Sequence, residues 1–325
     1  MTPTLSATVV ARNEERFIGQ ALAGINSQTL VPDEVVVVDD ASTDRTREIV
    51  EAFDGPAPIR YFRHETPLGS IAARNRAIAE ACGDLIAECD ADDIWLPEKL
   101  ERQVRVLLDG DSERIAVLGC AGRNITENGA DVGTFSVRMT SPNGFREVLD
   151  EEDVLMLPHS SVVFRRSDFQ RVGGYQEDYL GAEDVELWER MAQCGLVLNL
   201  PDELFLYRKK RGGLMQTVFW KQQVNELRVT ENRKRAREGL EPLSFEAFTR
   251  HLHQEPRRLR WSRWRQWYGT YFYRFGASNL VNGRRAMGGV QLAIAAALEP
   301  ARVKAGLARY ARRRPVSDAG STVSD

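Results

Sequence analysis

The sequence predicts an α/β fold built around a mostly parallel sheet. Apolar segments typical of buried strands alternate four times with segments of helical period in roughly the first hundred residues. One of them, Val35–Val38, is a run of four valines and is apolar on both faces, as a central parallel strand is. Such sheets bind ligands beyond the carboxyl ends of their strands. Polar residues that follow the strands are therefore the first candidates for a functional site.

The expected elements divide the chain into three parts. Strands are expected at residues 5–10, 35–38, 59–62, 85–88, 115–120, 160–164, 196–200 and 204–207. Asn13 is placed to cap the first helix, with Glu14 and Glu15 in its first turn. From Gln216 the pattern is mostly helical. We predict an α/β domain over residues 1–212, a helical region over 213–311 and a disordered tail over 312–325.

Composition and charge exclude several classes of protein. The chain has 325 residues and a formal net charge of −3, which argues against a nucleic-acid binder. No apolar run approaches the roughly 18 residues of a membrane span, and no secretory signal is visible. The four cysteines lack the spacing of a zinc site and lie in or beside apolar runs, which is typical of reduced thiols. We therefore expect a cytoplasmic protein.

Three carboxylates, Asp90, Asp92 and Asp93, are crowded into the turn after the fourth strand. Pro97 marks the start of a helix just beyond them. Like charges this close repel one another unless they are fully solvated or hold a cation. Hard oxygen ligands suit Mg²⁺ or Mn²⁺, which often take further ligands from substrate phosphates. The residues alone leave a solvated acidic loop and a divalent metal site open.

Other charged residues are expected at the same edge of the sheet. Asp39 and Asp40 follow the second strand, and Arg74 lies in the helix after the third. Glu183 and Asp184 open a later helix, where the helix dipole favours negative charge. That dipole explains the last pair without any chemistry, so a structural and a catalytic role both remain open.

Aromatic and basic residues alternate near the carboxyl terminus. Trp261, Trp264 and Tyr268 recur at helical spacing among arginines between residues 257 and 265. The spacing predicts a helix with an aromatic face and a cationic flank. Such a helix either packs against the protein or binds at the surface of an anionic membrane.

Several segments together resemble family 2 glycosyltransferases. They are residues 35–46, residues 69–75 with Ala-Ala-Arg-Asn, residues 90–97 with Asp-Ala-Asp-Asp-Ile-Trp-Leu-Pro, and Gly-Gly-Tyr at 173–175 with Glu-Asp-Val-Glu-Leu-Trp at 183–188. The similarity runs from Leu5 to Arg211 in the order of the family. It implies a GT-A fold and inverting, metal-dependent transfer of a sugar from a nucleotide donor to a hydroxyl. The products expected are cell-surface polysaccharide, O-antigen or glycolipid.

The resemblance also implies roles for residues around the donor. Asp90 and Asp92 match the DXD motif, which implies that Asp92 binds Mg²⁺ or Mn²⁺ and that Asp90 lies nearer the ribose or a metal-bound water. Asp39 and Asp40 match the pair that contacts base and ribose. Two further cationic side chains are implied near the nucleotide and its diphosphate, Arg74 and Arg208.

On the acceptor side, Asp184 matches the catalytic base of the family, with Glu183 beside it, and His159 is expected near the acceptor. The donor would be a UDP-, GDP- or dTDP-sugar. The acceptor would be a saccharide or a lipid-linked saccharide, which the aromatic, basic carboxyl-terminal region suits at the inner face of the membrane.

The segment after the first strand departs from the family. Members usually have Pro-Thr-Tyr-Asn or similar where this chain has Val10-Ala11-Arg12-Asn13. We expect Val10, Arg12 and Asn13 to line the nucleotide pocket, with Arg12 at the base or phosphate. The departure leaves the identity of the base open.

Two other functions remain open. A nucleotidyltransferase that makes or uses nucleotide sugars also combines an α/β sheet with paired carboxylates. It needs a glycine-rich phosphate loop, which residues 10–15 lack. A non-catalytic nucleotide-sugar-binding module would keep the fold without the chemistry, yet the expected carboxylates are all present.

Overall fold

The computed structural model describes residues 3–109, 113–135, 137–210 and 214–311. It forms two compact units, Met1–Gln254 and Glu255–Asp325. The first unit holds the sheet together with helices α1 to α9, and the second holds α10 to α12. The predicted functional boundary at residue 212 stays a prediction, and the predicted tail over 312–325 lies outside the described residues.

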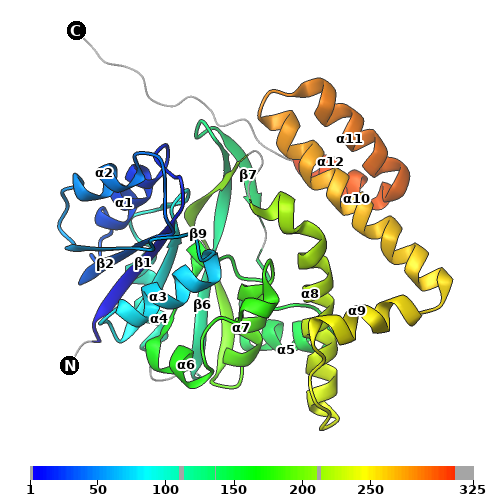
Figure 1. Cartoon of the computed structure of the whole chain (residues 1–325), viewed down its shortest axis with the longest axis horizontal. Helices are drawn as coiled ribbons and strands as arrows, with labels where there is room; N and C mark the ends of the chain where they lie inside the picture. Colours follow the sequence, from blue (N-terminus) through cyan, green and yellow to red (C-terminus); the bar gives the residue numbers. More distant parts are fainter. Residues whose placement is uncertain (1–2, 110–112, 136, 211–213, 312–325) are drawn as a thin grey trace. The chain divides into compact units, whose positions relative to one another are not determined.

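One mixed sheet organises the first unit (Figure 1). Its strands run in the order β3-β2-β1-β4-β8-β6-β9-β5, and β7 pairs with β6. The first four strands of this order are parallel, and both β8 pairings are antiparallel. The strands are β1 (Leu5–Ala11), β2 (Glu34–Asp39), β3 (Ile59–Arg63), β4 (Leu85–Asp90), β5 (Ile94–Trp95), β6 (Ile115–Thr126), β7 (Asp131–Phe135), β8 (Val163–Arg165) and β9 (Leu196–Lys209).

The parallel register fixes which residues meet at the carboxyl edge of the sheet. Val10 of β1 lies opposite Val38 of β2 on one side and Asp90 of β4 on the other. The next residue, Ala11, lies opposite Asp39. The two acidic segments are therefore separated by a single strand. Their convergence, expected from the alternation of strands and helices, is confirmed.

Helices cover the sheet and complete its core. Helix α3 contacts β1 and β2, and α4 contacts β6, β8 and β9. The helices of the first unit are α1 (Ile18–Asn26), α2 (Thr46–Glu51), α3 (Ser70–Glu80), α4 (Lys99–Leu107), α5 (Pro142–Asp150), α6 (Arg166–Arg171), α7 (Glu183–Met191), α8 (Leu214–Arg237) and α9 (Phe245–Gln254). The periodic apolar residues Leu100, Val104 and Leu107 of α4 are buried, as an amphipathic helix on a sheet requires.

Three local predictions were wrong. The first helix begins at Ile18, and Asn13 does not cap it. Asn13 instead has a φ of +56°, a left-handed turn conformation that asparagine tolerates. The strand expected at 160–164 is a 3₁₀ turn, His159–Ser161, followed by the short β8. The two strands expected at 196–200 and 204–207 form one strand, β9, with register shifts against β6 between Cys120 and Gly122.

A buried lysine lies at the start of α4. The Lys99 side chain is fully buried, and its Nζ lies 4.2 Å from the centroid of the Trp95 ring. This Nζ has no hydrogen-bond partner in the described residues. Burial lowers the pKa of Lys99 to about 8, because the charged form loses its water.

The second unit is a helical hairpin followed by a shorter helix. It contains α10 (Arg257–Val281), α11 (Arg285–Leu298) and α12 (Pro300–Ala311). Helices α10 and α11 approach closely at glycines, since a Cβ on Gly288 would lie 2.8 Å from the carbonyl oxygen of Gly276. None of the helices in the described residues is both long and apolar enough to cross a bilayer.

Candidate active site

The acidic turn between β4 and β5 holds three converging carboxylates. Oxygens of Asp90, Asp92 and Asp93 lie within 4.8 Å of one another. The turn is fixed from behind by Ser160, whose Oγ accepts the N–H of Asp90 at 2.9 Å and whose carbonyl accepts the indole N–H of Trp95 at 2.8 Å. The carboxylates are therefore held together by the fold.

The pKa values of the three carboxylates are shifted differently because their partners differ. Burial alone would raise the pKa of Asp90, but the Arg74 guanidinium, 2.5 Å from its Oδ1, brings that pKa below its usual value. Burial outweighs the nearby ammonium of Lys210 at Asp92, whose pKa is raised. Burial and the charges of Asp92 and Asp90 raise the pKa of Asp93 well above normal. A divalent cation would relieve this repulsion, and the hard oxygen donors fit Mg²⁺ or Mn²⁺.

Lys210 is a second cation that reaches this turn, beside Arg74. Its Nζ lies 2.9 Å from Asp92 Oδ2 and 2.5 Å from Glu14 Oε1. Burial alone would lower the pKa of Lys210, but the charges of Asp92 and Glu14 raise it. The sequence analysis named Arg208 and not Lys210, and it placed Glu14 in the first turn of the first helix, which begins only at Ile18.

Arg208 is buried and its donors are occupied by the protein. Its Nε donates to the carbonyl of Asp92 at 2.8 Å, and its Nη2 donates to Gln20 Oε1 at 2.8 Å. Its Nη1 donates to the carbonyl of Glu127 at 3.0 Å. The Arg208 N–H also donates to Asp93 Oδ1 at 2.8 Å. Arg208 therefore supports the acidic turn from β9.

A buried polar chain continues from the acidic turn into the core. Arg74 of α3 lies between Asp90 and Glu88, whose Oε1 is 3.5 Å from its Nη1. The Tyr175 hydroxyl donates to Glu88 Oε2 at 2.5 Å. Burial raises the pKa of Glu88 to about 7. Sequence analysis missed Glu88 and Tyr175, although a single carboxylate in an apolar strand was a visible signal.

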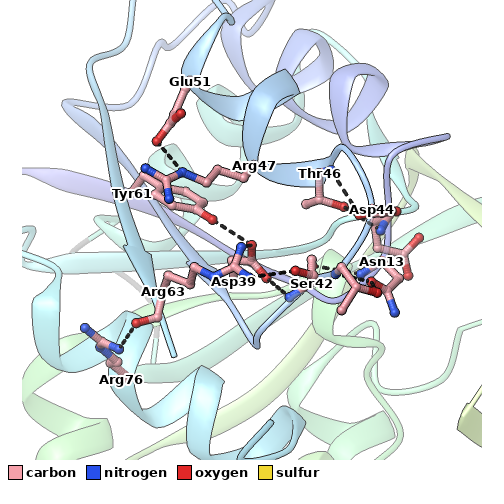
Figure 2. Close-up of polar contacts among 12 residues, drawn as sticks. Asn13, Asp39, Ser42, Asp44, Thr46, Arg47, Glu51, Tyr61, Arg63 and Arg76 are labelled. Carbon is pink, nitrogen blue, oxygen red and sulfur yellow. Dashed lines mark hydrogen bonds and ion pairs between the residues drawn. The ribbon is translucent and has the colours of Figure 1, made fainter. Parts of the chain in front are cut away.

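Asp39 forms the centre of a second polar group, at the end of β2 (Figure 2). Its Oδ2 accepts the Tyr61 hydroxyl at 2.6 Å and Arg63 Nη1 at 3.2 Å, while Oδ1 accepts the N–H of Ser42 at 2.7 Å. Asn13 joins this group through the Ser42 hydroxyl, which accepts its N–H at 2.9 Å. The group tethers the turn after β1 to the turn after β2.

Asp40 does not belong to this group. It holds the segment that leads into α3. Its Oδ1 lies 2.8 Å from His64 Nδ1 and accepts the N–H of Leu68, and its Oδ2 accepts the N–H of Gly69 at 2.9 Å. Burial alone would raise the pKa of Asp40, but these hydrogen bonds lower it. Arg12, by contrast, is exposed, and the structure gives it no hydrogen bond or ion pair with a described residue.

Glu183 and Asp184 begin α7 without a cationic partner. Within the described residues neither carboxylate has an ion-pair partner within 4.0 Å; Glu183 accepts the N–H of Gly181, and Asp184 accepts that of Val185. Burial and the neighbouring Glu183 raise the pKa of Asp184 to about 8. Burial also raises the pKa of Glu183.

The charges of both the acidic turn and the start of α7 act on the Tyr207 hydroxyl of β9. Burial raises the pKa of its hydroxyl, and the charges of the three aspartates of the acidic turn and of Asp184 raise it further. His159 lies nearby, with its ring centroid 5.6 Å from that of Tyr175. Burial and the charge of Arg74 lower the pKa of His159 to about 3, so this imidazole is neutral near pH 7.

Two family models match the sequence. The model described as glycosyl transferase family 2 matches residues 6–173, and the one described as N-terminal domain of galactosyltransferase matches residues 160–213. A Haemophilus influenzae protein named as an uncharacterized glycosyltransferase is 26% identical over 215 residues, which cover 63% of this chain and 65% of the relative. The amylovoran biosynthesis glycosyltransferase AmsE of Erwinia amylovora is 28% identical, over 58% of this chain and 69% of the relative.

Solved structures share the fold. The Pyrobaculum calidifontis mannosyltransferase PcManGT in complex with GDP-Man and Mn²⁺ superposes with a TM-score of 0.54 at 22% identity, over 96% of this chain and 80% of that one. Staphylococcus aureus TarS in complex with UDP-GlcNAc gives a TM-score of 0.54 at 18% identity, over 93% and 92% of the two chains. Both likenesses support the predicted α/β architecture.

Proposed function

Because the chain belongs to glycosyl transferase family 2, we propose that it transfers a sugar from a nucleoside-diphosphate donor to a hydroxyl acceptor. The observation that carries this proposal is that the first unit holds two unlike groups of acidic side chains, one in the turn after β4 and one at the start of α7. The acidic turn is paired with cations, whereas Glu183 and Asp184 at the start of α7 have no ion-pair partner among the described residues. The acidic turn is suited to binding a metal ion and a phosphate, and the pair at the start of α7 is suited to accepting a proton.

The donor would bind along the carboxyl edge of β1, β2 and β4. Asp92 and Asp90 would hold Mg²⁺ or Mn²⁺, which neutralises the charge that develops on the leaving diphosphate. Lys210, already at Asp92, would contact the diphosphate in place of Arg208, whose donors are occupied. Asp39 and Asp40, which are buried and hydrogen-bonded within the protein, would position the turns that face base and ribose. The likeness to proteins solved with GDP-Man or UDP-GlcNAc supports a donor of this class.

Asp184 would take the proton of the acceptor hydroxyl. A general base works best when its pKa is near the working pH, and burial beside Glu183 provides that condition. Attack from the side opposite the diphosphate inverts the anomeric carbon. Glu183 and His159 would lie at the acceptor. Names of relatives that include amylovoran biosynthesis support a saccharide acceptor in polysaccharide synthesis.

A nucleotidyltransferase is less well supported. Residues 12–17, which follow β1, contain no glycine, and the N–H groups of Asn13 and Glu14 already donate to Ser42 and Thr46. This turn therefore offers few free amides to a triphosphate. A non-catalytic module would bind a nucleotide sugar without cleaving it, so slow hydrolysis of the donor in the absence of acceptor separates that function from a transferase.

Calorimetry with Asp92→Ala tests the donor site. Wild-type protein should bind a UDP- or GDP-sugar in the presence of Mn²⁺ and lose most of that affinity with a chelator, and Asp92→Ala should resemble the chelated protein at any Mn²⁺ concentration. Asp54→Asn, an exposed carboxylate outside the site, is the matched control. Mn²⁺-dependent binding that survives Asp92→Ala would contradict the assignment. A thermal-shift panel of nucleotide sugars with Mn²⁺ identifies the base.

A further inference from the structure

We propose that the second unit binds the surface of an anionic lipid bilayer through helices α10 and α11. This inference goes beyond the proposed reaction and does not depend on it. It rests on exposed aromatic and aliphatic side chains at helical spacing, together with a strong excess of positive charge in the same unit.

Helix α10 presents two large indoles to solvent. The exposed fraction is 64% for Trp261 and 40% for Trp264. Their rings stack with centroids 5.0 Å apart. Arg257, four residues before Trp261, lies on the same face of the helix, and Arg258 flanks it. Neither arginine has an ion-pair partner among the described residues. Exposed tryptophans beside arginines are characteristic of helices that lie in a membrane interface.

Helix α11 exposes an apolar stripe. Met287, Val290 and Ile294, spaced by three and four residues, are 51%, 62% and 37% exposed. The opposite face of the helix carries Gly288 and Ala295, which are buried. The stripe is therefore not the face of α11 that packs against α10 at Gly288. A contiguous apolar stripe on the surface of a helix usually marks a binding surface.

The positive charge of the second unit indicates that its partner is an anionic surface. Residues 255–325 contain 14 Lys and Arg against 4 Asp and Glu, while the whole chain has 44 against 47. The second unit is therefore strongly cationic, and the remainder of the chain is acidic. An anionic bilayer would attract this unit and repel the rest. A soluble polyanion would satisfy the arginines but would leave the indoles and the α11 stripe in water.

Flotation of the full-length protein tests this surface. Wild-type protein should float with vesicles of phosphatidylcholine and phosphatidylglycerol and remain behind with phosphatidylcholine alone. Arg257→Glu/Arg258→Glu should weaken partitioning by at least about tenfold. Met287→Gln/Val290→Gln should weaken it as well. The control Arg105→Glu/Arg171→Glu makes the same change in charge at exposed positions of the first unit and should float like the wild type.

Fluorescence distinguishes a bilayer from a soluble polyanion. Brominated anionic lipids should quench wild-type tryptophan emission, and Trp261→Phe/Trp264→Phe should lose most of this quenching. If anionic vesicles do not float the protein, or if bromolipids quench neither protein while heparin binds both, the proposal is overturned. Mn²⁺-dependent donor binding, measured in parallel by calorimetry, confirms that each variant is folded, and its failure in every protein would concern the proposed reaction alone.

Discussion

The acidic turn after β4 and the start of α7 are both clusters of buried carboxylates, but they are neutralised differently. Asp90 and Asp92 have Arg74 and Lys210 within 2.9 Å, whereas the partners of Glu183 and Asp184 among the described residues are backbone N–H groups. As a result, the pKa of Asp90 is lowered and that of Asp184 is raised to about 8. Residues of the same type thus acquire different chemistry from their partners alone.

Asp184→Asn tests the unpaired side of this comparison and should have the largest effect. An amide cannot accept the proton, so turnover should fall by about 10² to 10⁴-fold. Donor affinity measured by calorimetry with Mn²⁺ should stay unchanged, because the acidic turn is intact. Asp150→Asn, an exposed carboxylate, is the control. Normal turnover by Asp184→Asn would show that another group is the base.

Lys99→Met extends the comparison to a buried cation that has no ion-pair partner in the part of the chain that the structure describes. The folded-state pKa of about 8 lies below the unfolded value of 10.5, so the unfolded chain binds more protons between these values. Below pH 8 the lysine therefore costs about 3 kcal/mol, and this cost disappears as the pH rises through 10.5. Methionine should stabilise the protein by up to that amount in denaturant unfolding at pH 7.

The matched control for Lys99→Met is Lys221→Met, a partly exposed lysine 5.5 Å from the Phe245 ring. It should change the free energy of unfolding little. A stabilisation by Lys99→Met that does not shrink between pH 8 and pH 10.5 would show that packing, rather than charge, is responsible.

Tyr175→Phe tests the buried polar chain that runs from the acidic turn through Arg74 to Glu88 and Tyr175. Loss of the hydroxyl leaves Glu88 Oε2 without its donor, which should lower the free energy of unfolding by about 2 kcal/mol. Donor affinity should fall less than in Asp92→Ala, because Arg74 retains Asp90. Urea unfolding and calorimetry on the same samples measure both effects. Unchanged stability would mean that water replaces the hydroxyl.

The smallest expected effect is the change in kcat/KM of sugar transfer for each unit of pH. Asp184 must be ionised to act, so kcat/KM should fall tenfold per pH unit below about pH 8, a change of about 1.4 kcal/mol per unit. Above pH 8 the rate should level off. The residual activity of Asp184→Asn should not show this fall below pH 8. If the fall persists in that variant, another group is responsible for the titration.

The sequence predicted the parts of the fold that depend on local pattern. The continuous apolar run Val35–Val38 predicted β2, which is buried throughout, and the acidic residues that follow the strands predicted the site. Both are patterns of residues that are neighbours in the sequence. The start of α1 was missed because the N–H groups of Asn13 and Glu14 bond to Ser42 and Thr46, about thirty residues away. Strand β5 was missed because two residues carry no period.

The missed site residues share one property, which is that their partners lie far away in sequence. Lys210 and Glu14 are separated by 196 positions, and Tyr175 and Glu88 by 87. Neither pair produces a local pattern. Arg208 shows the converse, since its position in the sequence did not reveal that its side chain donates to the carbonyls of Asp92 and Glu127.

The salt bridge from Lys210 to Asp92 affects how a divalent ion and a sugar nucleotide would bind together. A divalent ion must compete with an ammonium for the same carboxylate, so the protein on its own should hold the ion loosely. A diphosphate beside it would give the displaced ammonium a new counter-charge. Binding of either ligand would then strengthen binding of the other. Thermodynamic linkage requires that the affinity for the ion and the affinity for the sugar nucleotide rise by the same factor. Ion and sugar nucleotide should accordingly load as a pair.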